Sequence, residues 1–445
     1  MKAAIRARRQ GAHSAFADRR LLIFRQPSAI VLFFTLASAG AAESPADWPQ
    51  WRGPNRDAIC GETGLLQSWP EDGPPLEWKV TGLGGGYSTP TIHGGRIYGL
   101  SYRGPDEVVW CLDAATRREI WVRRIAAKGR VGYNEGSRGS PTIDGGRLFV
   151  VGVSGDVACL DAATGRVLWS RNFERDFGGR MMSGWGFSES PLIDGNKVIV
   201  TPGGDDAALV ALDKATGRTL WQSAVPDGGG AGYGSPMVAE VGGVRMAINW
   251  LGRALVGVAV DDGRLLWQYA RTANQTANIP TVIVRGGTVF CSTAYNTGSA
   301  VLRLERTPDG VRAVEVAFVP PRVFQNHHGG VVLVGDHVYG GHGTNGGAPT
   351  CIEFATGKLA WKQDRSSGGG SAAVLYADGH LIFRWQDGTL GLIEANPGRY
   401  KLKGSFRPKD RTNANAWSHP VIVDGRLYLR DQDILLCYDL RDRNR

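Results

Sequence analysis

Apolar residues occur along this chain in short runs separated by turn-forming Asp and Gly residues. Residues 139–169 show the pattern clearly. Pro141-Thr-Ile143 leads to the turn Asp144-Gly-Gly146, and apolar runs at 147–153 and 157–160 follow. A second turn, Asp161-Ala-Ala-Thr-Gly165, precedes a last run that starts at Val167. Short β-branched runs bounded by Asp-Gly turns predict strands joined by tight hairpins. The unit therefore predicts four short antiparallel strands.

This unit recurs through most of the chain. The first-strand signature recurs around Pro90, Pro141, Pro191, Pro236, Pro280 and Pro420, with weaker copies at 329–330 and 371–372. A fourth-strand aromatic recurs at Trp121, Trp169, Trp221, Trp267, Phe318, Trp361 and Phe406. The first four prolines lie about 50 residues apart, which is the period of four-stranded propeller blades. The sequence therefore predicts an all-β protein, an eight-bladed β-propeller of four-stranded antiparallel blades.

The two ends of the repeat region complement each other. The last unit, residues 417–439, contains three predicted strands, whereas Leu76–Val80 is an isolated fourth strand with its own Trp78. We expect strand 76–80 to complete the C-terminal blade and to close the ring without a free edge. The predicted propeller covers residues 76–440, and residues 441–445 are predicted to be a disordered tail.

Residues 1–42 have the composition of an export signal. Arginines precede an apolar run at 29–39 that ends in Ala39-Gly-Ala-Ala42, as in a secretory signal peptide. The alternatives are an uncleaved N-terminal anchor and, because of Arg19-Arg20, a twin-arginine route. This leader supplies most of the excess of basic over acidic residues that gives the whole chain its formal net charge of +9. We therefore expect no nucleic-acid partner, no transmembrane span in the mature chain, a monomer, and a location in the periplasm or cell envelope of a bacterium.

Residues 43–75 do not follow the repeat. The segment holds Trp48, Trp51 and Trp69, and exposed indoles are costly. We expect a strap packed on the propeller in preference to a flexible linker. The cysteines contain no adjacent pair and no Cys-x-x-Cys motif. Cys111, Cys159, Cys351 and Cys437 share one repeat position, so we expect small buried apolar residues and no disulfides.

The repeat unit resembles that of the pyrroloquinoline-quinone-type (PQQ-like) propeller superfamily. The resemblance rests on the unit Pro…Gly-Arg-Leu-Phe…Leu-Asp-Ala-Ala-Thr-Gly-Arg-Val-Leu-Trp and covers about residues 47–440. The opening Trp48-Pro-Gln-Trp-Arg-Gly-Pro54 is similar to that of exported bacterial members. The superfamily contains quinoprotein dehydrogenases and non-enzymatic scaffolds of the BamB type, so the resemblance implies the fold and leaves the function open.

The loops that lead into each first strand are the most variable part of the repeat, and they share one face of the ring. Function usually lies on such loops. We predict a binding site at this channel mouth, formed by Tyr87, Asn134, Arg138, Trp185, Tyr233, Asn278, His327, His328, His342, Trp385, Trp417, His419 and Arg430.

Catalytic and metal-binding candidates are few in these loops. Glu135 and Glu189 are candidate general bases, but lone carboxylates more often cap loops or form ion pairs. His327, His328 and His342 are candidate metal ligands, and hydrogen bonding within the rim is the alternative.

Two functions from different classes follow. The first is a non-catalytic exported scaffold that binds an envelope protein, a peptide or a glycan at the channel mouth. The second is a PQQ- and Ca²⁺-dependent quinoprotein dehydrogenase acting on an alcohol or sugar. The chain lacks the adjacent Cys pair and the Cys-x-x-Cys-His haem motif of those enzymes, and it has few acidic residues at the mouth to hold Ca²⁺. We therefore expect the binding function.

Overall fold

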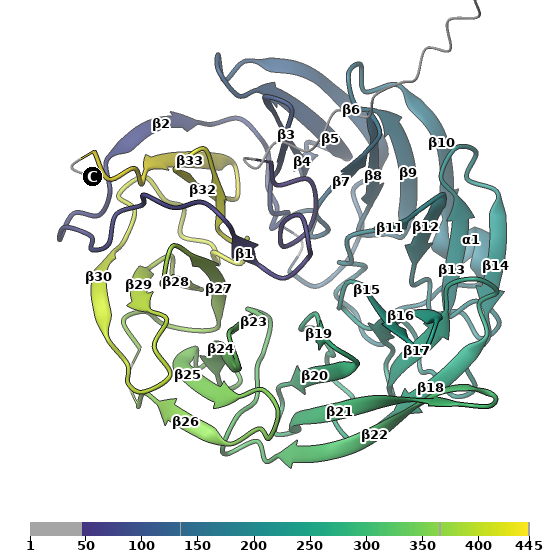
Figure 1. The fold of residues 1–445 in the computed structure, drawn as a ribbon. Helices are drawn as coiled ribbons and strands as arrows, with labels where there is room; N and C mark the ends of the chain where they lie inside the picture. The colour runs from purple at the N-terminus through teal and green to yellow at the C-terminus, as the bar shows by residue number, and fades with distance from the viewer. Residues whose placement is uncertain (1–46, 134, 365, 444–445) are drawn as a thin grey trace, which may run out of the picture. The chain divides into compact units, whose positions relative to one another are not determined.

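A computed structural model describes residues 47–133, 135–364 and 366–443. The predicted signal peptide and the mouth candidate Asn134 lie outside the described residues. Strands arranged as eight sheets around a central axis make up this part of the chain, which confirms the predicted eight-bladed propeller (Figure 1). Within these residues, no helix is long and apolar enough to cross a membrane.

Each blade is an antiparallel meander whose first strand is innermost. Blade 1 consists of β3 (Thr91–His93), β4 (Arg96–Arg103), β5 (Asp106–Asp113) and β6 (Glu119–Ala127), and blade 2 of β7 (Thr142–Asp144), β8 (Arg147–Val151), β9 (Asp156–Asp161) and β10 (Val167–Asn172). Blade 3 consists of β11 (Leu192–Asp194), β12 (Lys197–Val200), β13 (Leu209–Asp213) and β14 (Thr219–Ser223), and blade 4 of β15 (Met237–Val241), β16 (Val244–Trp250), β17 (Leu255–Ala259) and β18 (Leu265–Tyr269).

Blades 5 to 8 repeat this order with two additions. Blade 5 consists of β19 (Ile283–Arg285), β20 (Thr288–Thr293), β21 (Gly298–Thr307) and β22 (Gly310–Val319), and blade 6 of β23 (Val331–Val334), β24 (His337–His342), β25 (Ala348–Glu353) and β26 (Leu359–Lys362). Blade 7 consists of β27 (Ala372–Ala377), β28 (His380–Trp385), β29 (Leu390–Glu394) and β30 (Leu402–Phe406), and blade 8 of β31 (Val421–Val423), β32 (Arg426–Asp431) and β33 (Ile434–Asp439). Blade 7 gains β1 (Ile59–Cys60), which pairs parallel to β27, and blade 8 gains β2 (Leu76–Val80). The short helix α1 (Phe173–Phe177) follows β10.

The turn chemistry explains why the repeat folds this way. Gly145 and Gly146 have φ of 55° and 76°, which suits the left-handed turn between the first and second strands. Asp161 accepts hydrogen bonds from the backbone N–H and the hydroxyl of Thr164, at 2.9 and 2.7 Å. These bonds close the turn before the fourth strand and lower the pKa of Asp161.

Tryptophans hold neighbouring blades together. The Trp169 indole N–H donates to the carbonyl of Lys214 in the next blade, at 3.1 Å. Its ring covers Gly217, where a Cβ would come within 2.6 Å of the indole. Trp121 on Gly165 and Trp221 on Gly263 repeat the contact. The repeat therefore encodes the packing between blades as well as the blades themselves.

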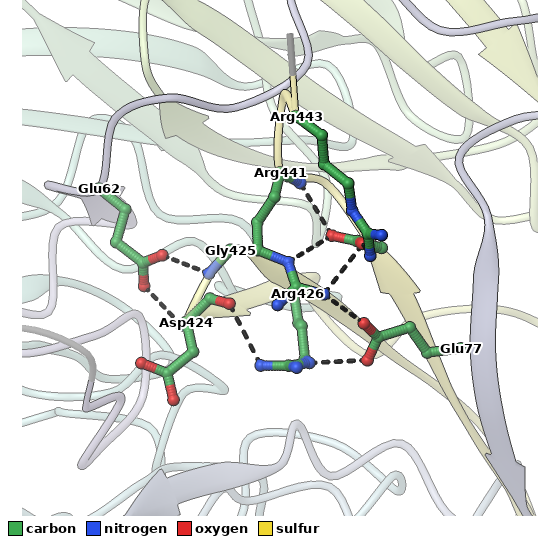
Figure 2. A network of polar contacts seen from close by, with 8 residues as sticks. Glu62, Glu77, Asp424, Gly425, Arg426, Arg441 and Arg443 are labelled. Carbon is green, nitrogen blue, oxygen red and sulfur yellow. Dashed lines mark hydrogen bonds and ion pairs between the residues drawn. The ribbon is translucent and has the colours of Figure 1, made fainter. Parts of the chain in front are cut away.

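The ring closes as predicted, through β2 on β33. Figure 2 shows the polar contacts around this junction (Figure 2). Glu77 on β2 forms ion pairs with Arg426 and Arg441, at 2.7 and 2.5 Å. Asp439 pairs with Arg441 and Arg443, both at 2.7 Å, so the first residues of the predicted C-terminal tail take part in the closure.

The segment that precedes β2 enters the central channel. We call residues 47–62 the plug. Asp47 accepts a hydrogen bond from Gly94 N at 3.2 Å, and Glu62 accepts hydrogen bonds from Asp424 N and Gly425 N at 2.9 and 2.6 Å. Gly94 and Asp424 lie in turns between first and second strands, so both ends of the plug are on the face opposite the predicted mouth.

Between its two ends the plug crosses the axis of the ring. In order along the plug, its hydrogen bonds reach Ile92 on β3, Ile143 on β7, Thr281 before β19, Val331 on β23, Ser190 and Pro191 before β11, and Tyr376 on β27. Trp48 is buried, and Arg52 and Arg56 are 3% and 4% exposed. The channel is therefore filled from the far face by residues of the plug.

All the cysteines in the described residues are buried and free. Burial raises the pKa of the Cys159 and Cys437 thiols to about 12. They behave as small apolar core residues, as the repeat position predicts.

Candidate functional site

One cavity of about 270 Å³ lies where the loops that lead into the first strands converge. Its walls come mostly from residues just before β3, β7, β11, β15, β19, β23 and β31, and its floor comes from Trp51 and Arg52 of the plug. Because the plug fills the channel behind it, the cavity has one mouth, on the face of the variable loops.

Most of the predicted mouth residues meet in this cavity. Those that line it are Tyr87, Arg138, Trp185, Tyr233, His327, His328, Trp417 and His419. They come from six separate loops, which the ring brings to one place.

The other candidates lie elsewhere and make structural contacts. Asn278 is buried and donates to the carbonyls of Leu251 and Gly252. Trp385 is fully buried, and its indole N–H donates to Gly347 O at 2.9 Å. His342 accepts a long hydrogen bond from Gln325 N, at 3.4 Å. Arg430 is fully buried and donates to backbone carbonyls and to Ser101 Oγ.

The two carboxylate candidates do not line the cavity. Glu135 is exposed in its loop. Glu189 is 3% exposed; its Oε1 accepts a hydrogen bond from Thr201 N at 2.7 Å, and its Oε2 has no partner among the described residues. Burial raises the pKa of Glu189 to about 7, although the charge of Arg56 acts in the opposite direction.

Aromatic rings form a continuous surface inside the cavity. Trp417 lies at the centre, with ring centroids 4.7 Å from Tyr87, 5.2 Å from Tyr133 and 4.8 Å from His328. The stack continues from His328 to His327 at 4.1 Å. On the floor, Trp51 lies 4.5 Å from the ring of His419. These rings present wide apolar walls with polar edges.

The histidines in this surface are neutral hydrogen-bonding groups. His327 bonds Tyr295 OH through Nε2 at 2.7 Å and Ser371 Oγ through Nδ1 at 2.8 Å. Burial lowers the pKa of His327 to about 4. Burial and the nearby charge of Arg52 lower the pKa of His419 to about 3. Positive charge in the cavity therefore comes from Arg52 and Arg138.

The donor set does not fit a PQQ–Ca²⁺ centre. Ca²⁺ takes six to eight oxygen ligands, carboxylates prominent among them. Of the described side chains that line the cavity, none is Asp or Glu. Across residues 47–443, apart from the two masked positions, no group of three or more His, Cys, Asp or Glu is placed to hold a metal ion. The cavity offers aromatic faces, guanidinium groups and uncharged amides and hydroxyls, which is the chemistry of ligand binding.

Several lining residues were not among the sequence predictions. Trp51 and Arg52 come from the plug, whose only signal was a concentration of tryptophan that had to be buried. Tyr295, Asn345 and Gln386 come from loops between second and third strands. In a four-stranded meander these loops lie on the same face as the loops that lead into the first strands, so strand order was the signal that could have found their polar and aromatic residues.

Comparisons with known proteins bear on the fold and the family. The family profile described as outer membrane protein assembly factor BamB matches residues 105–341 and 307–442. No curated protein matches the chain.

Solved structures share the fold at low identity. BamB from Moraxella catarrhalis is 14% identical, with a TM-score of 0.57, and the match covers 82% of this chain and 97% of that protein. The quinohemoprotein alcohol dehydrogenase from Comamonas testosteroni is 15% identical, with a TM-score of 0.65 and coverage of 92% and 82%. A europium-containing methanol dehydrogenase is 14% identical, with a TM-score of 0.59 and coverage of 87% and 89%. Such likeness establishes the fold alone, whereas the profile matches most of the propeller: the chain belongs to the BamB family of PQQ-like repeat β-propellers.

Proposed function

We propose that the protein is a non-catalytic binding or assembly scaffold of the bacterial cell envelope, which holds part of a peptide, glycan or protein partner in its cavity. The observation that carries this proposal is the lining: stacked aromatic rings and two arginines, with no carboxylate among the described side chains to act as a general base. Export rests on the composition of residues 1–42. We further propose that the mature chain is a monomer.

A direct experiment separates binding from dehydrogenation. Purified protein is incubated with PQQ and Ca²⁺, dialysed, and examined for absorption and dye-linked alcohol oxidation. We expect no stoichiometric chromophore and no oxidation. A bound quinone together with alcohol-dependent dye reduction would replace the proposal with the dehydrogenase function.

The binding side is tested by Trp417→Ala. This change removes the ring that contacts Tyr87, Tyr133 and His328. In envelope extracts we therefore expect the yield of partners cross-linked to the mouth to fall at least tenfold relative to the wild type. Trp361→Phe, between blades and far from the cavity, controls for general loss of an indole. Unchanged cross-linking by the Trp417→Ala protein would contradict a role for the cavity.

A further inference from the structure

The charge of the cavity points to a more specific ligand. We propose that the cavity binds the terminal residue of an anionic glycan: one sugar ring that carries a carboxylate or a sulfate group. This inference rests on the proposed binding function and names the ligand class of the same site.

Arg52 on the floor supplies the first argument. Its guanidinium donates only to backbone carbonyls, those of Arg56 at 3.3 Å, Asp57 at 3.1 Å and Val331. Its Nη1 has no partner within the described part of the chain, although the residue is 3% exposed and lines the cavity. A buried charge with an unsatisfied donor is costly, and an anion offers both the missing acceptor and the opposite charge.

Arg138 on the wall supplies the second argument. Its hydrogen bonds go to the carbonyls of Gly132 and Tyr133, at 2.6 and 2.7 Å, and its guanidinium lies 6.0 Å from the ring centroid of Tyr87. The loop thus holds a second cation against the aromatic surface through neutral acceptors. Burial lowers the pKa of Arg138, and the charge of the Glu135 carboxylate, which lies outside the lining, acts in the opposite direction and offsets part of this positive charge. Two guanidinium groups bonded to carbonyls, with no Asp or Glu among the described lining side chains, still favour an anion over a cation or a neutral group.

The aromatic walls select among anions. A bare carboxylate, or an Asp or Glu side chain, would meet the arginines but leave the faces of Trp417, Tyr87 and Trp51 uncovered. A sugar ring covers such faces with its C–H groups, while its hydroxyls can bond the side chains of Asn345 and Gln386, which also line the cavity. Gln386 is already oriented, because its Oε1 accepts a hydrogen bond from the Trp417 indole at 2.9 Å.

The closed floor limits the length of the ligand. The plug blocks the channel behind Trp51 and Arg52, so a polymer cannot thread through it. The volume of about 270 Å³ lies at the small end of ligand cavities, which run from about 300 to 1,000 Å³. The end of a glycan chain fits this shape, and its interior does not.

Calorimetry with matched sugars tests the proposal on the purified mature protein. The anionic probes are the methyl glycosides of glucuronic, galacturonic and mannuronic acids, and galactose 6-sulfate. The neutral counterparts are the methyl glycosides of glucose, galactose and mannose, and a tetraglutamate peptide is the non-sugar anion. We expect at least one anionic sugar to bind about tenfold or more tightly than its neutral counterpart, with an affinity that falls as NaCl is raised. The uronate and sulfate arms show which anion is preferred.

Variants locate the binding. Arg138→Gln should weaken the anionic sugar about tenfold or more and leave neutral sugars unchanged, whereas Trp417→Ala should weaken both. Arg245→Gln is the matched control, because it removes a partly exposed arginine whose ion pair with Asp194 lies at a turn between first and second strands, on the face opposite the mouth. The Arg52→Gln variant is informative only if circular dichroism shows that it folds. If it does not fold, the Arg138→Gln variant still decides the test.

Three outcomes would overturn the inference: equal affinity for acidic and neutral sugars, tighter binding of the tetraglutamate peptide than of any sugar, or no binding of any anionic sugar. Each of these leaves the proposed function standing if cross-linked partners are still lost in the Trp417→Ala protein. The proposed function fails separately, through the quinone and oxidation experiment.

Discussion

Buried charged side chains are the least ordinary residues of this protein. Arg52, Arg56, Arg384 and Arg430 are each at most 4% exposed, and burial lowers the pKa of Arg52 and Arg384 to about 10. They are held chiefly by backbone carbonyls. The repeat could not reveal these contacts, because each arginine occurs in a single copy and its acceptors lie far away in the sequence. Of these four arginines, Arg52 alone lines the cavity, and the other three make contacts within the fold.

Glu189 makes the stability of the protein depend on pH. Its pKa is about 7 in the folded chain, against an ordinary value of 4.5. The stability that it contributes is therefore fully present below pH 4.5 and is lost as the pH rises through 7. Between pH 4.5 and 8 we expect the wild type to lose about 3 kcal/mol of unfolding free energy relative to Glu189→Gln.

Urea unfolding of the two proteins at both pH values measures this difference. Glu107 is fully buried and its pKa is also raised to about 7, so Glu107→Gln should give a similar change, and the double variant should give their sum. Parallel pH profiles for wild type and Glu189→Gln would show that the Glu189 carboxyl has the same pKa in the folded and unfolded states, which would contradict the expected shift.

Between secondary-structure elements, the contact of a fourth-strand tryptophan with a turn glycine is the interaction that packs one blade against the next. Both partners are read directly from the repeat, which explains why strand number and blade closure could be predicted so completely. The turn is local, and the tryptophan recurs at a fixed position. Loops carry no such repetition, so the sequence places the site on a face of the ring without saying which side chains point into the cavity.

Gly217→Ala tests this contact. Gly217 has φ of 70°, and an added Cβ would come within 2.6 Å of the Trp169 ring. Gly195→Ala is the matched control, because Gly195 has φ of 59° and nothing lies within 4 Å of its added Cβ. Both variants should lose about 1–2 kcal/mol from the left-handed backbone, and Gly217→Ala should lose at least about 1 kcal/mol more from overpacking.

Equilibrium unfolding in urea gives both values. If the two alanine variants prove equally stable, the Trp169 ring moves aside freely, and the tryptophan does not hold the blades in register.

At the scale of the whole propeller, ring closure holds the first and last blades together. The pairing of β2 with the buried strand β33 closes the ring, and the ion pairs of Glu77 and Asp439 lie at its edge (Figure 2). The closure could be predicted because the missing strand at one end matches the extra strand at the other. The plug could not: it has no repeat, and its partners are distributed over residues 92–425.

Glu77→Gln measures what the ion pairs add to the closure. Glu77 is 22% exposed as a side chain, and its partners are 29% and 39% exposed. We expect a loss of about 0.5–1 kcal/mol in low salt that disappears in 1 M NaCl, because exposed pairs are weak and screened. The control is Asp106→Asn, which removes an exposed pair with Arg124 inside blade 1. A salt-independent loss of several kcal/mol would mean that Glu77 has a packing role.

The plug also bears on how the chain reaches its folded state. The plug is synthesised before any blade. Leu65, just after the plug, pairs with Arg441, and β2 pairs with β33, so both contacts require the C-terminal end of the chain. Contacts of such long sequence separation form late, because the loop-closure entropy must be met first. Blades can form one after another during synthesis, but the cavity floor is secured only when the C-terminal strands arrive. The cavity is thus completed by the last step of folding, so an incompletely folded chain has no finished cavity floor.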